Sequence, residues 1–223
     1  MRNKFLIAAL SFIMIIFVTA CGNSAQKVEQ ENNSAQSATK TDDTTKSTAG
    51  KKILVVYFSR TGENYEVGNI SRGNTQIVAE MIATKVGADT FEIKPVKPYP
   101  ENYKECTEVA KAEKEADARP AIVGDVENFD DYDVIFFGYP NWWSDMPMIM
   151  YTFMENHNFK DKTVIPFCTS SSEYFIGKEE IQQYAKGSTV LDGLGIRGKR
   201  CQENPESVRQ DVDKWLAGLG IGN

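Results

Sequence analysis

Short apolar runs alternate with longer amphipathic stretches along the chain after residue 50. The third run reads Val-Ile-Phe-Phe, apolar at every position, as expected for a parallel strand covered on both faces. The apolar runs predict five strands, at 53–58, 90–93, 134–138, 164–168 and 189–191.

The stretches between these runs have the period of amphipathic helices. From Asn74 onwards, Ile77, Val78, Met81 and Ile82 fall on one side. The other helices are predicted at about 102–118, after Pro147, and at about 178–186 and 205–218. Strict alternation of strands and helices predicts an α/β fold: a doubly wound five-stranded parallel sheet with helices on both faces and right-handed crossovers.

The N-terminus reads as an export signal followed by a spacer. Residues 1–20 combine a basic start with an uncharged apolar segment that is short for a membrane span. Val18-Thr19-Ala20-Cys21 resembles a bacterial lipoprotein processing site, so we expect lipidation of Cys21 and anchoring to the outer face of the cytoplasmic membrane. Residues 21–50 have little apolar content and are predicted to be a disordered tether. The alternatives are an ordinary cleaved signal and an uncleaved anchor.

The charge of the chain narrows the function classes. The net charge is -6, and removal of residues 1–20, with two positive and no negative charges, would make it -8. No basic stripe is available to pair with phosphates, which argues against nucleic acid binding. An acidic surface favours solubility, and it also favours binding to a basic patch on a redox partner.

Cysteine and histidine usage argues against a metal site. Cys106, Cys168 and Cys201 have unrelated spacing and form no C-x-x-C pair. His157 is the only histidine and is interpreted as a surface or capping residue. A Cys168–Cys201 disulfide is possible if both lie at the carboxyl edge of the sheet, and the sequence leaves this open.

A phosphate-binding loop split by an insertion follows the first strand. Ser59-Arg60-Thr61-Gly62 comes directly after the strand, and Asn74-Thr75 opens the first helix, with Glu63–Gly73 between them. Amides of a first helical turn lack partners, and the helix dipole favours an anion there. Hydroxyls suit a terminal phosphate monoester, and neither Gly-Lys-Ser/Thr nor Gly-x-Gly-x-x-Gly is present. The alternative is a polar β–α turn with a hydroxyl cap.

Two further loops at the same predicted edge combine polar and aromatic residues. Pro140-Asn141-Trp142-Trp143 follows the third strand, and adjacent indoles cannot both face one core. Thr169-Ser170-Ser171-Ser172 and Tyr174 follow the fourth strand. An indole and Tyr174 can cover the two faces of a flat ligand ring, with serine groups at its polar edge. The alternative is that the rings pack on neighbouring segments and the serines form a simple turn.

Together these loops resemble the flavodoxin family, over residues 51–218. Its phosphate loop is matched by Ser59, Thr61, Gly62, Asn74 and Thr75, and its ring loops by Gly138, Pro140, Trp142, Trp143 and Thr169–Tyr174. The resemblance implies the sheet order 2-1-3-4-5 and a site between the first and third strands. It is closest to short-chain members, since no long insertion divides the fifth strand. The chain departs from the family pattern in two ways. The insertion splits the phosphate motif, so either Gly62 or Gly73 holds the tight turn. The predicted export also differs, because the family is mostly cytoplasmic.

The resemblance implies non-covalent FMN as the cofactor. The residues expected to bind it are Ser59, Arg60, Thr61, Gly62, Gly73, Asn74, Thr75, Pro140, Asn141, Trp142, Trp143, Thr169, Ser170, Ser171, Ser172 and Tyr174. No catalytic side chain is expected, because the cofactor carries the redox chemistry.

Three functions are compatible with this reading. The first is an FMN-dependent electron carrier at the extracytoplasmic membrane surface, served by a redox partner protein or a membrane electron donor. The second is an FMN-dependent NAD(P)H oxidoreductase of the quinone or flavin reductase type, which the scarcity of nicotinamide cofactors outside the cytoplasm disfavours. The third is a non-redox binding module, which the intact hydroxyls and paired tryptophans disfavour. Donor, acceptor, reduction potential and oligomeric state stay open.

Overall fold

The computed structural model describes residues 50–221. The predicted signal peptide, the lipidation site Cys21 and the tether up to residue 49 lie outside these residues and stay predictions.

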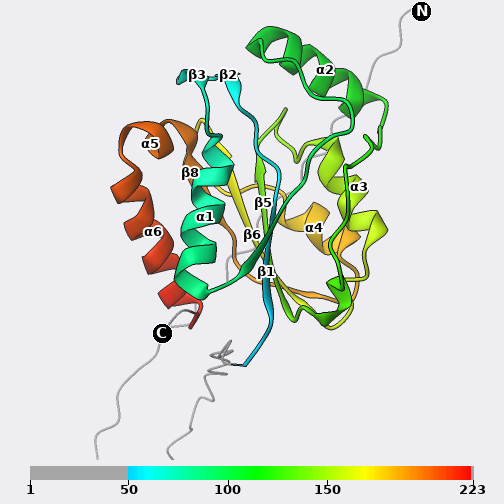
Figure 1. Ribbon diagram of the computed structural model, residues 1–223, viewed down its shortest axis with the longest axis vertical. Coiled ribbons are helices and arrows are strands. Elements are labelled where there is room, and N and C mark those ends of the chain that lie inside the picture. The colour runs from blue at the N-terminus through cyan, green and yellow to red at the C-terminus, as the bar shows by residue number, and fades with distance from the viewer. Residues whose placement is uncertain (1–49, 222–223) are drawn as a thin grey trace, which may run out of the picture. The chain divides into compact units, whose positions relative to one another are not determined.

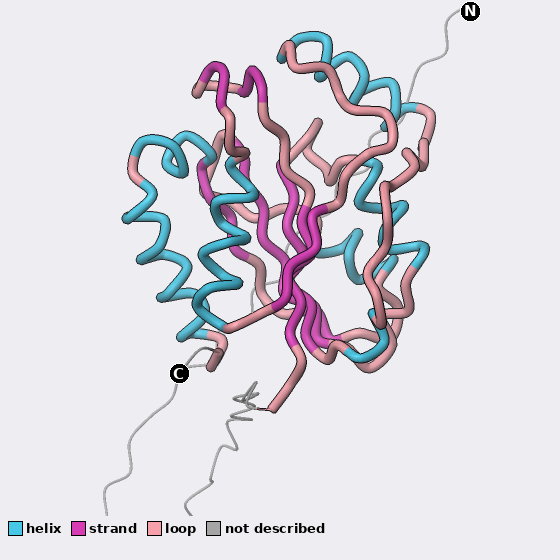
Figure 2. The backbone as a smooth tube through the Cα atoms, in the orientation of Figure 1, coloured by secondary structure: helices cyan, strands magenta, loops and turns pink. Residues whose placement is uncertain are grey.

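Parallel strands and helices alternate along most of this region (Figure 2). The strands are β1 (Ile53–Tyr57), β2 (Gly62–Asn64), β3 (Gly68–Ile70), β4 (Asp89–Glu92), β5 (Val134–Pro140), β6 (Thr163–Ser170), β7 (Thr189–Val190) and β8 (Leu194–Arg197). The helices are α1 (Asn74–Val86), α2 (Tyr103–Glu115), α3 (Met148–Asn156), α4 (Lys178–Tyr184), α5 (Gly198–Glu203) and α6 (Pro205–Gly218), with a 3₁₀ turn at Phe129–Asp131.

The main sheet has the strand order β4-β1-β5-β6-β7, and β8 also pairs with β6. All its pairings are parallel, and β1 lies between β4 and β5. In the numbering of the five predicted strands, β1 is the first, β4 the second, and β5, β6 and β7 the third to fifth. The observed order is therefore 2-1-3-4-5, which confirms the predicted flavodoxin-like fold. The strand order reverses between β1 and β5, so ligands of such a fold bind at the carboxyl ends of these two strands.

The fifth strand was predicted as one run at 189–191. Strand β7 lies at this position, but the prediction missed β8. The fifth strand consists of two pieces, β7 beside the start of β6 and β8 beside its end. Between them, Gly193 lies so close to Phe175 that a Cβ would be 2.6 Å from the Phe175 ring. The chain leaves the sheet after Leu191, whose amide still donates to the Val164 carbonyl oxygen of β6, and it returns as β8.

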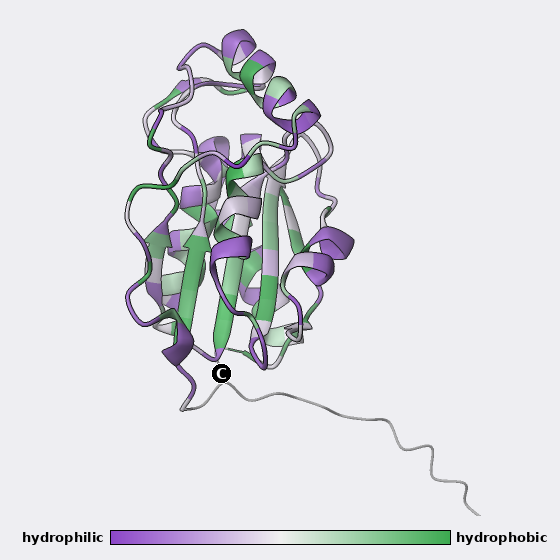
Figure 3. Cartoon of the chain, turned by 90° about the vertical axis from the view of Figure 1, so that its right-hand side faces the viewer, coloured by the Kyte–Doolittle hydropathy of each residue, from purple (hydrophilic) through white to green (hydrophobic). Residues whose placement is uncertain are grey.

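Helices cover both faces of the sheet (Figure 1), and its central strands are hydrophobic (Figure 3). A separate core lies on each face. On one face, α1 and α6 bury residues such as Val78 and Leu216 against the odd-numbered side chains of β1, and on the other face α3 buries Ile149 and Phe153. Cys168 belongs to the α3 core and Cys201 to the α1 and α6 core. Because they lie on opposite faces of the sheet, both are free thiols, and the disulfide that the sequence left open does not form.

The insertion and α2 lie beyond the carboxyl edge of the sheet (Figure 1). The insertion forms an antiparallel hairpin, β2–β3, in a second small sheet. Helix α2 buries only Cys106 and Ala110, so little of its surface joins either core. Within residues 50–221, no helix has the length and apolar character needed to cross a membrane.

Candidate functional site

The two ends of the interrupted loop meet at the start of α1. The Oγ atom of Ser59 accepts a hydrogen bond of 3.0 Å from the amide of Gln76 in the first turn of the helix. The Oγ1 atoms of Thr75 and Thr169 are 2.7 Å apart in a buried hydrogen bond, which ties the helix start to the end of β6. The amides of Asn74 and Thr75 have no acceptor within their own helix, so they remain suited to an anion.

Both glycines that frame the insertion are required, for different reasons. Gly62 has a φ of +78°, the left-handed region that favours glycine, and it forms the tight turn. Gly73 has an ordinary φ of -68° as the N-cap of α1. A Cβ on Gly73 would overlap the Oγ of Ser59 and lie 2.8 Å from the carbonyl oxygen of Arg60. Gly73 therefore permits the close approach of the two halves of the loop.

The hairpin is fastened to the segment that precedes α2. The guanidinium of Arg60 donates to the carbonyl oxygens of Pro100 and Glu101, at 2.8 and 2.6 Å. In return, the carboxylate of Glu63 accepts from the Asn102 side chain and the Tyr103 amide, at 2.8 and 2.9 Å. Arg60, expected on the phosphate, thus donates to backbone carbonyl oxygens in this structure.

A cavity of about 420 Å³ lies beneath the hairpin and α2. This volume is within the range of small-molecule sites, roughly 300–1,000 Å³. Nine of the predicted residues line it: Arg60, Asn74, Pro140, Asn141, Trp142, Trp143, Thr169, Ser170 and Ser171. Seven do not: Ser59, Thr61, Gly62, Gly73, Thr75, Ser172 and Tyr174. Of these seven, Ser59, Gly73 and Thr75 support the wall from behind through the contacts above.

The adjacent tryptophans have different surroundings. The Trp142 ring packs edge-on against Phe58 and Tyr99, with centroids 5.4 and 4.9 Å apart. The Trp143 ring is 51% exposed, and its Nε1 donates to the carbonyl oxygen of Thr107 in α2. Both rings line the cavity, so each can offer a surface to a flat ligand.

The loop that carries the tryptophans is held in an uncommon backbone conformation. Trp143 and Ser144 have φ values of 55° and 57°, which non-glycine residues seldom adopt. Asp145 fixes the end of the loop, since its carboxylate accepts from the Met146 amide and the Tyr151 hydroxyl and pairs with Lys114 at 3.0 Å. Strained loops that are fixed in this way concentrate at binding sites.

Asn141 supplies an acceptor that has no protein partner. Its amide donates to the carbonyl oxygen of Thr169, which continues the β5–β6 pairing past the strands. Its Oδ1 atom is buried and has no hydrogen-bond partner within the described part of the chain, although the residue lines the cavity. An unpaired buried acceptor costs about 1–3 kcal/mol, and a ligand N–H would satisfy it. The imide N–H of a flavin is a donor of this kind, so the residues present fit the cofactor that the sequence predicts.

The second ring loop is shaped by its own hydrogen bonds. The Oγ of Ser170 accepts from the Ser172 amide at 2.9 Å. Tyr174 is 79% exposed and lies outside the cavity wall, so it does not cover a ligand ring in this structure. Ser172 stabilises the turn after β6 and does not line the cavity.

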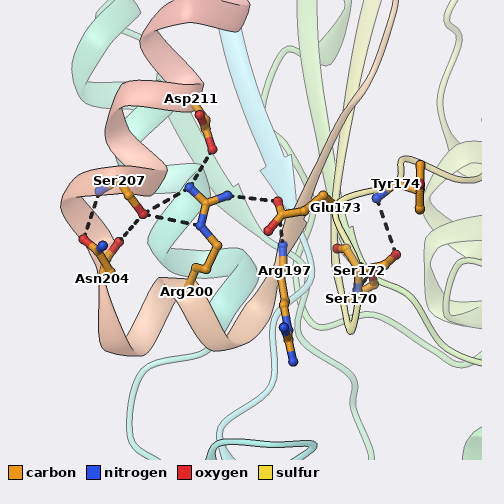
Figure 4. A network of polar contacts seen from close by, with 9 residues as sticks. All are labelled: Ser170, Ser172, Glu173, Tyr174, Arg197, Arg200, Asn204, Ser207 and Asp211. Atoms are coloured by element: carbon orange, nitrogen blue, oxygen red, sulfur yellow. Dashed lines mark hydrogen bonds and ion pairs between the residues drawn. The ribbon is translucent and has the colours of Figure 1, made fainter.

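A charged network connects this loop to the last two helices (Figure 4). Glu173 accepts from Arg200 at 3.0 Å, and Arg200 also reaches Asp211 at 2.6 Å and Ser207 at 3.0 Å. At the same place, a Cβ on Gly195 of β8 would overlap the backbone of Tyr174. The loop is therefore fixed from the side of β8, α5 and α6.

Replacing Arg200 with methionine should loosen this loop with little loss of stability. The side chains of Arg200, Glu173 and Asp211 are 29, 49 and 43% exposed, and exposed ion pairs contribute less than about 1 kcal/mol each. We expect the free energy of unfolding to fall by about 1 kcal/mol or less, and the affinity for FMN to fall several-fold.

Urea denaturation and FMN titration measure these two effects. Arg209→Met is the matched control, because the one ion pair of Arg209 with a residue of the described range 50–221 is an exposed i,i+3 pair with Glu206 on α6. Equal FMN affinity in the two variants would show that the network does not position the loop.

Several cavity residues were not predicted from the sequence. They come from the hairpin, from α2 and from α5: Asn64, Tyr65, Glu66, Tyr103, Cys106, Thr107, Ala110, Gly198 and Lys199. Helix α5 also positions Asn74, because Gln202 donates to the Asn74 Oδ1 at 2.8 Å. Tyr65, the single aromatic residue of the insertion, was the one available signal, and α5 is too short to show a helical period.

The thiols of the domain are not activated. Burial raises the pKa of Cys106, which lines the cavity, and raises the pKa of Cys168 to about 11 and of Cys201 to about 12. The thiolate is the reactive form, so these groups are poor nucleophiles at neutral pH. Across residues 50–221, no three potential metal-ligating side chains gather into a cluster.

Fold and site together define a class: a doubly wound α/β domain with a phosphate-type loop after its first strand and an aromatic cavity at the switch point. The family model described as Flavodoxin matches residues 52–216. The chain therefore belongs to the flavodoxin family, as the sequence predicted. Family membership supports FMN as the cofactor.

Solved structures agree with this assignment. A chain described as a flavoprotein from Bacteroides eggerthii is 30% identical, with a TM-score of 0.56 over 77% of this chain and 99% of that one. A flavoprotein from Lactobacillus acidophilus, solved in complex with FMN, is 21% identical, with a TM-score of 0.51 over 69% of this chain and 97% of that one. The second likeness shows the fold alone. None of the curated proteins compared with the chain matches it.

Proposed function

We propose that this protein binds FMN and carries electrons at the extracytoplasmic membrane surface. The observation that supports this best is one cavity that joins the start of α1, the tryptophans of the β5 loop and the free acceptor of Asn141. The L. acidophilus relative, whose structure contains FMN, has the same fold.

The residues of the site have separate parts in this proposal. The amides at the start of α1 hold the phosphate, and the hydroxyls of Ser59 and Thr75 position this turn from behind the cavity wall. Trp142 and Trp143 cover the ring, and Asn141 accepts from its imide edge. The bound flavin supplies the redox chemistry, and the protein holds and orients it.

Location and partners follow from the sequence and are part of the proposal. The lipoprotein-type segment ending at Cys21 would tether the domain to the outer face of the cytoplasmic membrane. A mature net charge of -8 favours a basic redox partner protein or a membrane electron donor over nucleic acid.

A second candidate is an FMN-dependent NAD(P)H oxidoreductase of the quinone or flavin reductase type. The observation in its favour is the cover that the hairpin and α2 form over the cavity, because a covered site suits a small-molecule partner. A non-redox binding module is the third candidate, and a cavity that takes up no flavin would favour it.

Titration of the purified mature domain with FMN and with riboflavin tests the proposal. We expect a yellow protein with a flavin absorption spectrum, and binding of FMN at least about a hundredfold tighter than riboflavin, or roughly 2.7 kcal/mol, because only FMN carries the phosphate. Equal affinity for FMN and riboflavin would refute the phosphate site. A colourless protein that binds neither would refute the assignment of FMN as the cofactor. Steady NAD(P)H oxidation with an added quinone would favour the second candidate.

A further inference from the structure

We infer that the face of α2 over the cavity is a binding site for a flat, uncharged aromatic molecule beside the flavin. This inference rests on the proposed function, since it assumes that the opposite side of the cavity holds FMN. The site would be formed by Tyr103, Cys106, Thr107 and Ala110 of α2 and by Tyr65 of the hairpin.

Helix α2 is attached at both ends and spans the cavity between them. Its first turn is fixed to the hairpin by Glu63, which accepts from the Tyr103 amide. Its second half is fixed to the tryptophan loop, because Lys114 donates to the carbonyl oxygen of Trp143 at 2.8 Å and pairs with Asp145 at 3.0 Å. The middle of the helix contributes little to either hydrophobic core.

The side chains that α2 presents to the cavity share one chemistry. All four lining residues are uncharged, and Cys106 and Ala110 are its two buried residues. The charged residues that alternate with them, such as Lys104, Glu108 and Lys111, do not line the cavity. A helix that keeps its charges outside and its small apolar groups over a cavity favours an uncharged occupant.

Aromatic rings stand at the side where α2 meets the hairpin. The rings of Tyr65 and Tyr103 have centroids 6.0 Å apart and planes tilted by 37°. They are 57% and 38% exposed, although both line the cavity. Exposed rings that border a cavity gain stacking and burial when a flat aromatic molecule enters. Trp143 also lines the cavity and donates to the Thr107 carbonyl oxygen of α2, and the three rings together favour an aromatic over an aliphatic occupant.

Calorimetric titration of the FMN-loaded domain with menadione, a small uncharged quinone, tests the inference. Both flavin and quinone are oxidised and no reductant is added, so binding is read without turnover. Ala110→Leu should fill the space under α2 and weaken menadione binding at least tenfold, with FMN affinity unchanged within threefold. Ala112→Leu is the matched control, because Ala112 is exposed on the same helix.

The outcomes are distinct. Menadione binding that only Ala110→Leu weakens supports the inference. FMN uptake without menadione binding overturns it, and so does equal weakening by the two variants. A parallel loss of FMN affinity in Ala110→Leu also overturns it, because this face would then belong to the cofactor site. A wild-type domain that takes up no FMN refutes the proposed function as well. If leucine at position 110 prevents folding, Tyr103→Ala replaces it, with the same expected tenfold loss.

Discussion

Alanine at position 73 should reduce FMN affinity at least about a hundredfold, or roughly 2.7 kcal/mol. The added methyl group would overlap the Oγ of Ser59 and lie 2.8 Å from the carbonyl oxygen of Arg60. Both neighbours belong to the first half of the phosphate loop, so the two halves must move apart. That movement also breaks the hydrogen bond of 3.0 Å from the Gln76 amide to Ser59. We expect a further loss of stability of about 1–3 kcal/mol, as is usual for overpacking.

FMN and riboflavin titrations of Gly73→Ala, with thermal unfolding of the apoprotein, measure these effects. The variant should lose most of the preference for FMN over riboflavin, because the damage is at the phosphate end. Gly218→Ala is the control, since a Cβ there meets nothing within 4 Å at the end of α6. A Gly73→Ala protein that binds FMN as tightly as the wild type would exclude this turn as the phosphate site.

The main architecture could be predicted because it depends on periodicity. The buried strands β1, β5 and β6 are apolar on both faces, and α1 shows a clear stripe from Ile77 to Ile82. Alternation of such elements leaves few topologies. The loops Ser59–Gly62 and Pro140–Trp143 then follow strands whose carboxyl ends must meet at one edge. Pattern and topology therefore located the centre of the site.

The cover of the cavity could not be predicted, because its contacts are between backbone groups and distant side chains. Arg60 holds the carbonyl oxygens of Pro100 and Glu101, forty and forty-one residues later. Glu63 caps the start of α2 in a similar way. Such contacts leave no period in the sequence, and they turn an insertion that splits a motif into one side of the binding cavity.

The same reason explains the errors around the fifth strand. Strand β7 has two residues and β8 four, and Gly193 and Gly195 make room for Phe175 and for the backbone of Tyr174. Packing between these segments decides where the strand breaks. Tyr174 was predicted to stack on the ligand, yet its backbone is what packs on Gly195, and its exposed side chain does not line the cavity.

The buried pair of hydroxyls at Thr75 and Thr169 offers the second large effect. The two oxygens are 2.7 Å apart, so one hydroxyl donates to the other. The second proton of the pair remains free for an outside acceptor, since each hydroxyl can donate once and accept twice. Thr75→Val should remove one of the two hydroxyl donors and leave Thr169 without its partner. We expect a stability loss of about 1–3 kcal/mol in the apoprotein and a loss of FMN affinity of about ten- to a hundredfold, or roughly 1.4–2.7 kcal/mol.

A double-mutant cycle separates the structural part of this effect from the part that acts on the ligand. Thr169→Val alone should cost as much stability as Thr75→Val, and the double variant should cost less than their sum, because replacing both partners leaves no buried hydroxyl unpaired. FMN affinity should stay low in the double variant, since its free donor is still missing. Thr84→Val, at an exposed position on α1, should change neither quantity. Additive stability losses would contradict the buried hydrogen bond, whereas normal FMN affinity in the double variant would contradict its role in binding the phosphate.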